Sequence, residues 1–120
     1  MYIKDRTKCE EIIAGDRTAL REILNPHREP DLACRYSLAE ARVAPGQSTL
    51  PHKLKMSEVY YILEGEAEMR IGDDRQNVGP GQAIYIPPHS TQSIKNTGRR
   101  ELVFLCLVDP AWRAEDEELA

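Results

Sequence analysis

The sequence predicts an all-β domain, either a sandwich or a barrel, from two observations. Turn signals recur at short, regular intervals from residue 45 onward and separate short apolar or alternating segments. Two of these segments, residues 59–63 and 102–108, are apolar at both parities, as strands covered on both faces are. The turn signals are Pro45-Gly46, Glu64-Gly65, Gly72-Asp73-Asp74, Gly79-Pro80-Gly81, Pro87-Pro88 and Asn96-Thr97-Gly98.

The first third of the chain is less regular than the rest. Residues 1–16 mix charged and apolar side chains and are expected to be irregular, with one helical turn at most. Residues 18–24 predict a short strand that stops at Asn25-Pro26, because the residue before a proline is disfavoured in the helical region. Residues 27–31 predict a loop, and residues 33–43 alternate imperfectly as a strand does.

The two fully apolar segments need a cover on their outer faces, which a second sheet or a partner subunit could supply. Val59, Tyr61 and Leu63 alternate with the inward-facing set and would leave an apolar stripe in water. We therefore predict a homodimer.

The acidic tail, residues 109–120, opens with Asp109-Pro110, a capping side chain followed by a proline that suits the first helical position. This pattern predicts a short helix through Leu119.

Composition limits the partners and the compartment. The chain has 120 residues, enough for one domain with a single core, and a formal net charge of -4 without a basic patch. These features argue against nucleic acid and anionic membranes as partners and favour small molecules and other protein chains. The three cysteines form no zinc-binding or redox pair, so we interpret them as reduced thiols in the cytoplasm. No signal peptide or membrane-spanning segment is recognisable.

A histidine and a glutamate are spaced as metal ligands in residues 46–65. His52 follows Gly46 by six residues, Glu58 follows His52 by six, and Gly65 follows Glu58 by seven. Residues 52, 54 and 58 share one face of an extended chain, because strand side chains alternate with period 2. An imidazole and a carboxylate would then meet inside one cavity.

A second spaced set lies in residues 81–96. It consists of Gly81, Pro87, Pro88, His89, Gln92 and Asn96. Together the two sets resemble the two motifs of the cupin family, with motif 1 at residues 46–65 and motif 2 at residues 81–96. Leu54 stands at the second histidine of motif 1. In motif 2, His89 replaces a glycine and Gln92 stands at the third histidine.

The resemblance implies a double-stranded β-helix, a jelly-roll barrel whose mouth holds a metal bound by three histidines and one glutamate. His52, Glu58 and Gln92 are the candidate ligands here. The ion would be Mn, Fe, Ni or Zn, since an imidazole in the set favours a transition metal. Binding should be weak, because a carboxamide is a poor ligand and Leu54 cannot ligate.

Several readings of the candidate residues stay open. His52 could be a polar rim residue, whereas a buried Glu58 needs a partner, which could be His52, a metal ion or a nearby lysine. Leu54, Tyr60, Tyr85 and His89 are candidates to line the cavity. His89 could also act as a substitute ligand or base, or simply occupy a surface turn.

Three functions follow for a small stand-alone cupin with a site around His52 and Glu58. It could bind a divalent metal weakly together with a small polar molecule. It could be a metal-free protein that binds a small molecule or acts on it by proton transfer, as isomerase-like cupins do. It could also be a non-catalytic assembly or regulatory module.

Overall fold

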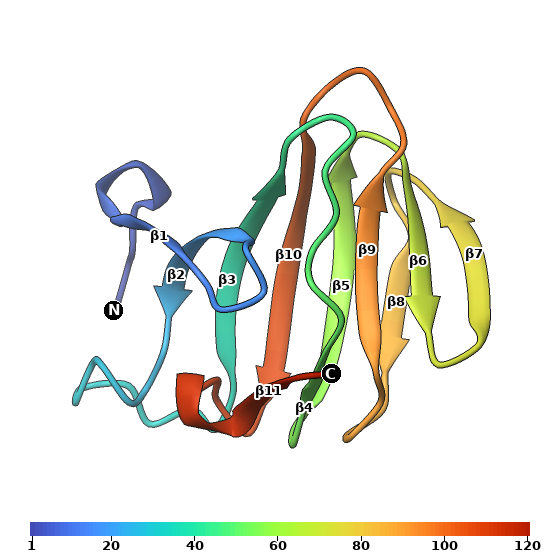
Figure 1. The fold of residues 1–120 in the computed structure, drawn as a ribbon. Coiled ribbons are helices and arrows are strands. Elements are labelled where there is room, and N and C mark those ends of the chain that lie inside the picture. Colours follow the sequence, from blue (N-terminus) through green and yellow to red (C-terminus); the bar gives the residue numbers. More distant parts are fainter.

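Two antiparallel β-sheets face each other across the interior of the protein (Figure 1). The computed structural model describes residues 1–120. One sheet has six strands in the order β1-β2-β3-β10-β5-β8, and the other has five in the order β11-β4-β9-β6-β7. The prediction of an all-β domain is confirmed, with eleven strands in the structure. None of the helical segments is long or apolar enough to cross a membrane.

The elements follow one another along the chain with short connections. The strands are β1 (Glu11–Ile13), β2 (Ala19–Leu24), β3 (Ser37–Val43), β4 (His52–Leu54), β5 (Ser57–Glu64), β6 (Ala67–Ile71), β7 (Asp74–Val78), β8 (Ala83–Ile86), β9 (Gln92–Asn96), β10 (Leu102–Asp109) and β11 (Glu117–Leu119), and the two 3-10 helices are η1 (Arg6–Lys8) and η2 (Ala114–Asp116). The strand predicted at residues 18–24 is β2, and the expected irregular N-terminal segment contains η1 and the short strand β1.

The hydrophobic core fills the space between the sheets. Phe104 on β10 and Tyr60 on β5 pack with ring centroids 4.5 Å apart. Ile62, Ile86 and Phe104 are almost completely buried, and burial of each such side chain contributes about 1.5–3 kcal/mol to folding. The alternation of β5 explains this arrangement, because residues 58, 60 and 62 face inward and residues 59, 61 and 63 face outward.

Two motif residues serve the fold itself. Gly65 has a φ angle of +89°, and a Cβ added there would lie 2.9 Å from the backbone oxygen of Glu101, so only glycine fits this turn. Asn96 at the end of β9 is completely buried. Its amide donates to the carbonyls of Val43 and Arg100 and accepts from the N–H of Gly98. These bonds fasten the turns that flank the site strands.

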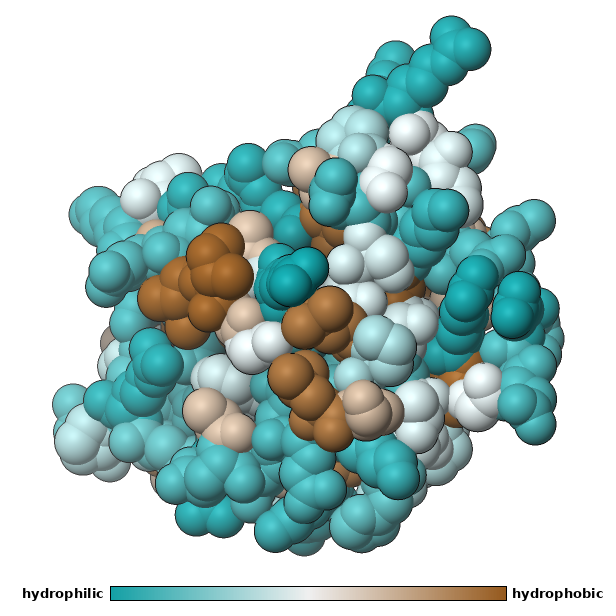
Figure 2. Space-filling view, viewed as in Figure 1, coloured by the Kyte–Doolittle hydropathy of each residue, from teal (hydrophilic) through white to brown (hydrophobic).

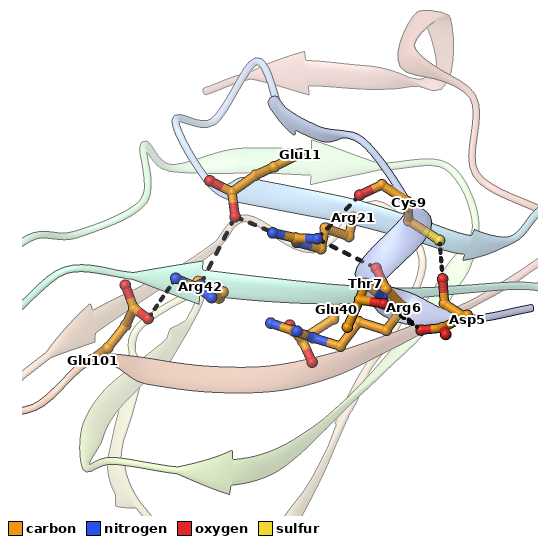
Figure 3. A network of polar contacts seen from close by, with 9 residues as sticks. All are labelled: Asp5, Arg6, Thr7, Cys9, Glu11, Arg21, Glu40, Arg42 and Glu101. Atoms are coloured by element: carbon orange, nitrogen blue, oxygen red, sulfur yellow. Dashed lines mark hydrogen bonds and ion pairs between the residues drawn. The ribbon is translucent and has the colours of Figure 1, made fainter.

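A network of ion pairs fastens the N-terminal segment to the outer side of the six-stranded sheet (Figure 3). The guanidinium of Arg6 donates to Glu40 on β3 over 2.6 Å, and Arg21 on β2 donates to the backbone carbonyls of Arg6 and Cys9. The Glu40 side chain is buried there despite pointing away from the core. The network therefore covers the outer side of β2 and β3.

The outer side of β5 and β8 has no such cover. Tyr61, Leu63 and Tyr85 are exposed there, and Leu107 of the neighbouring β10 is exposed beside Val59. By contrast, the surface seen from the side of Figure 1 is mostly hydrophilic, with a few separate hydrophobic groups (Figure 2). The apolar stripe predicted from the sequence is present on the protein.

The predicted C-terminal helix is wrong. Apart from the single 3-10 turn η2, the tail is extended, and Glu117–Leu119 pairs antiparallel with β4 as strand β11. Figure 1 shows this last strand lying beside β4. Local capping signals favoured a helix, but β4 offers an open edge whose backbone groups need partners, and pairing with that edge prevails.

Candidate functional site

A narrow cavity lies between the sheets beneath the β1–β2 loop and the C-terminal residues. The volume of this cavity is about 40 Å³, enough for a few waters. Nine of its sixteen lining residues are hydrophobic, and no lysine or arginine lines it. Its carboxyl groups belong to Asp16, Glu22, Glu58 and Glu117. The cavity therefore favours cations or neutral molecules over anions.

His52 on β4 points one ring nitrogen at this cavity. Its Nδ1–H donates to the backbone carbonyl of Leu50 over 2.8 Å, which leaves Nε2 as the nitrogen with a free lone pair. Nε2 lies 3.6 Å from Asp16 Oδ2 and 3.6 Å from Glu117 Oε1. These separations are too long for hydrogen bonds. The imidazole is thus held in one orientation and faces two carboxylates.

Asp16 and Glu117 reach the site from opposite ends of the chain, and both side chains are at least nine-tenths buried. In the β1–β2 loop, Asp16 Oδ1 accepts hydrogen bonds from the N–H and the hydroxyl of Thr18 at 3.0 and 2.7 Å. Burial raises the pKa of the Glu117 carboxyl, and the charge of Asp16 raises it further. Together with His52 they form a cluster whose ligand atoms lie within 4.8 Å of one another.

Glu58 on β5 and Gln92 on β9 form a second polar group. The Gln92 amide N–H donates to Glu58 Oε1 over 3.2 Å, and its carbonyl oxygen accepts from the Tyr60 hydroxyl over 3.0 Å. Burial raises the pKa of Glu58 to about 8 against the weaker opposing effect of the Gln92 bond, and the charges of Asp16 and Glu117 add to the rise. This carboxyl is therefore largely protonated at neutral pH.

The three ligand candidates of the sequence analysis are close in space. His52 and Gln92 are register partners across β4 and β9, and Gln92 contacts Glu58 directly. Gln92 bonds to Glu58 and Tyr60 but does not line the cavity, whereas His52 and Glu58 line it.

Leu54 and Tyr60 line the cavity as expected, but Tyr85 and His89 do not. Tyr85 is 61% exposed, because it pairs across the sheet with outward-facing Val59. His89 is exposed in the turn between β8 and β9, at a φ angle of +64°. Its backbone N–H donates to the carbonyl of Leu54, so this turn position serves the backbone and directs the imidazole to solvent.

Sequence reasoning missed Asp16 and Glu117. The Asp16-Arg17-Thr18 stretch carries a local signal for an aspartate that caps its own turn. Glu117 is one of four consecutive acidic residues and carries no signal of its own. Only the pairing of β11 with β4 selects it.

Comparisons with known proteins give a consistent assignment. The sequence profile of the family described as "Cupin domain" matches residues 39–108. The uncharacterized protein MJ1618 of Methanocaldococcus jannaschii is 39% identical over 113 residues, which cover 93% of this chain and 89% of that protein.

Solved structures share the fold. The polyketide cyclase RemF from Streptomyces resistomycificus superposes with a TM-score of 0.77 at 29% identity, covering 91% of this chain and 79% of that one. A predicted oxalate decarboxylase from Thermotoga maritima superposes with a TM-score of 0.76 at 22% identity, over 91% of this chain and 99% of that one. At that identity the second likeness concerns the fold alone. The predicted double-stranded β-helix is confirmed by these neighbours.

Proposed function

Since this chain belongs to the cupin-domain family, we propose that its cavity binds a divalent transition-metal ion through His52 and buried carboxylates, together with a small polar molecule. The observation that carries the proposal is the orientation of His52. Metal-binding histidines commonly donate their other ring N–H to a carbonyl or carboxylate, and this bond fixes the tautomer and the ring. The bond from His52 Nδ1 to Leu50 has this form.

The residues present fit a metal ion, but their ligand atoms differ from the three histidines and one glutamate of the full family set. Leu54 occupies a ligand position of motif 1 with an apolar side chain, and Gln92 already uses both ends of its amide. Buried carboxylates replace the missing imidazoles. One nitrogen among oxygen donors suits Mn or Fe at least as well as Zn or Ni. A bound ion would act as a Lewis acid that polarises an oxygen of the second molecule.

The size and charge of the cavity restrict the second molecule. A volume of about 40 Å³ is far below the roughly 300–1,000 Å³ typical of pockets for drug-sized ligands. No basic side chain is available to neutralise a dianion such as oxalate. We therefore propose a small neutral or cationic molecule with one polar end, because apolar residues line the remaining wall.

Metal analysis of protein purified without an affinity tag tests this proposal. We expect substoichiometric Mn, Fe, Ni or Zn on purification and saturable uptake of one ion by the stripped protein in calorimetric titration. His52→Ala should abolish the uptake, whereas His89→Ala, which removes an exposed histidine, should leave it unchanged. Full metal content in His52→Ala would contradict the proposal.

A metal-free function has its own supporting observation. Glu58 is a protonated carboxyl at the cavity wall, and its partner Gln92 connects it to the Tyr60 hydroxyl. A carboxyl with a pKa near neutrality suits general acid–base catalysis. If small-molecule binding or turnover survives complete removal of metal by a chelator and is lost in Glu58→Gln, this alternative replaces the first.

The protein is further proposed to be a homodimer. Tyr61, Leu63 and Leu107 are each about two-fifths exposed on adjoining strands, and a flat apolar sheet face of this kind is typical of a subunit interface. Light scattering should give twice 13.6 kDa. A dimer that binds neither a metal ion nor a small molecule would support the alternative of a non-catalytic assembly module. The three free thiols agree with a reducing compartment such as the cytoplasm.

A further inference from the structure

A set of possible ligands from outside the two cupin motifs converges on His52. Its Nε2 lies 3.6 Å from one oxygen of Asp16 and 3.6 Å from one oxygen of Glu117. Ligands bound about 2.1 Å from one ion stand roughly 3–3.5 Å apart. Resting on the metal-binding function proposed above, we infer that Asp16, His52 and Glu117 hold the ion, which thereby fastens the C-terminal segment (residues 110–120) over the cavity.

The motif residues Gln92 and Glu58 are less available to an ion than Asp16 and Glu117. Gln92 donates to Glu58 and accepts from Tyr60, so ligation by its oxygen would disturb the bond to the Tyr60 hydroxyl. Glu58 already accepts the amide N–H of Gln92 at Oε1 over 3.2 Å. The free lone pair of His52 instead faces Asp16 and Glu117, and no hydrogen bond occupies it.

Asp16 is held ready for this role by its own loop. Both hydrogen bonds from Thr18 go to Oδ1, and the oxygen nearest His52 is Oδ2. The backbone carbonyl of Asp16 also accepts from the N–H of Leu50 over 2.8 Å. The loop is thereby fixed to the chain just before β4, and the carboxylate position is set before any ion arrives.

The charges of the set match a divalent cation. As metal ligands, the two carboxylates would bring two negative charges into a buried site that no lysine or arginine lines. Side by side, the carboxylates repel each other, and burial increases this repulsion. A divalent ion would neutralise both, whereas a monovalent ion would leave one charge uncompensated.

Glu117 makes the site depend on the C-terminal segment. Its strand β11 pairs only with β4, and Trp112 of the same segment also lines the cavity. A molecule larger than a few waters fits only if some wall moves, and a three-residue edge strand opens more readily than a central strand. An ion on Glu117 would join this segment to β4 and to the β1–β2 loop, so that metal binding and closure become coupled.

Three isosteric variants test the inference. Glu117→Gln and Asp16→Asn remove one carboxylate each, and Glu118→Gln is the matched control, an exposed neighbour on the same strand. Stripped proteins are titrated with Mn²⁺ and Zn²⁺ by calorimetry. Backbone hydrogen exchange of residues 110–120 is then measured by mass spectrometry with and without the ion.

We expect both site variants to bind the ion more weakly by more than the roughly 10–100-fold that loss of an outer hydrogen-bonded partner causes, while Glu118→Gln binds normally. Without metal they should unfold at the same temperature as the wild type or a higher one, because repulsion is relieved. The ion should slow exchange of the C-terminal segment in the wild type and in Glu118→Gln only.

Three outcomes would overturn the inference in whole or in part, and they are distinguishable. Normal affinity in Glu117→Gln, with a wild type that does bind the ion, would place the ion elsewhere and leave the proposed function intact. The absence of any metal uptake by the wild type would remove both. Exchange of residues 110–120 that does not respond to a bound ion would remove the coupled closure.

Discussion

The cavity has two walls of different origin. The motif wall, made by His52, Leu54 and Glu58, stands on β4 and β5, which are each paired on both sides within their sheets, and Gln92 of β9 supports it through its bond to Glu58. The terminal wall, made by Asp16, Trp112 and Glu117, stands on the β1–β2 loop, on the segment between β10 and η2, and on the edge strand β11. The motif wall consists of buried side chains on these strands, so changes there act on folding as well as on the site. The terminal wall can vary while the barrel is kept.

The largest expected effect comes from Asn96, the buried motif residue at the end of β9 that serves the fold. Asn96→Ala removes three hydrogen bonds and deprives the carbonyls of Val43 and Arg100 and the N–H of Gly98 of this partner. The free energy of unfolding should fall by roughly 3–5 kcal/mol, as measured by urea denaturation. Asn77→Ala on the exposed edge strand β7 is the control. Equal losses in the two variants would contradict the role assigned to Asn96.

The next effect concerns pH and Glu58. Its pKa rises from an ordinary 4.5 to about 8 on folding, so between these values the unfolded chain binds fewer protons than the native protein. The contribution of Glu58 to stability should therefore be greatest at low pH and fall as pH rises, by at most about 1.4 kcal/mol per pH unit. Glu58→Gln should flatten this dependence between pH 5 and 8. Parallel curves for the two metal-free proteins would show that Glu58 is not buried as described.

Leu54→His tests whether the motif wall can be returned to the family pattern. Leu54 faces the cavity on the same strand as His52, so a second imidazole there should tighten metal binding in calorimetric titration. Loss of the buried leucine should lower the stability of the metal-free protein by about 1.5–3 kcal/mol. Lys53→His, on the exposed side of β4, is the control. Equal or weaker metal binding by Leu54→His would mean that residue 54 does not share the metal site.

The smallest expected effect belongs to the terminal wall. Leu119 is more than half exposed at the end of β11, and Leu119→Ser should change the free energy of unfolding by no more than about 0.5 kcal/mol. Urea denaturation measures this change directly. A loss as large as that of Asn96→Ala would show that β11 belongs to the folding core, and the contrast between the two walls would fail.

Much of the motif wall was predictable, because it depends on local rules. Strand alternation put His52, Leu54 and Glu58 on one face, and the motif spacing added Gln92 on a neighbouring strand. Alternation alone did not predict the orientation of Tyr85. Tyr85 faces outward because it is the register partner of outward-facing Val59, and this pairing of β8 with β5 is set by the tertiary structure.

The terminal wall was decided by tertiary structure. By itself the sequence determined the all-β fold, the motif turns and the inward face of β4 and β5, since each follows from steric preferences and alternation within a few neighbouring residues. Asp16 and Glu117 are a hundred residues apart and meet only because β4 leaves an open edge, which the tail fills as β11. Unpaired backbone groups, a property of the assembled sheet, overrode the local helix signal and brought the second carboxylate to His52.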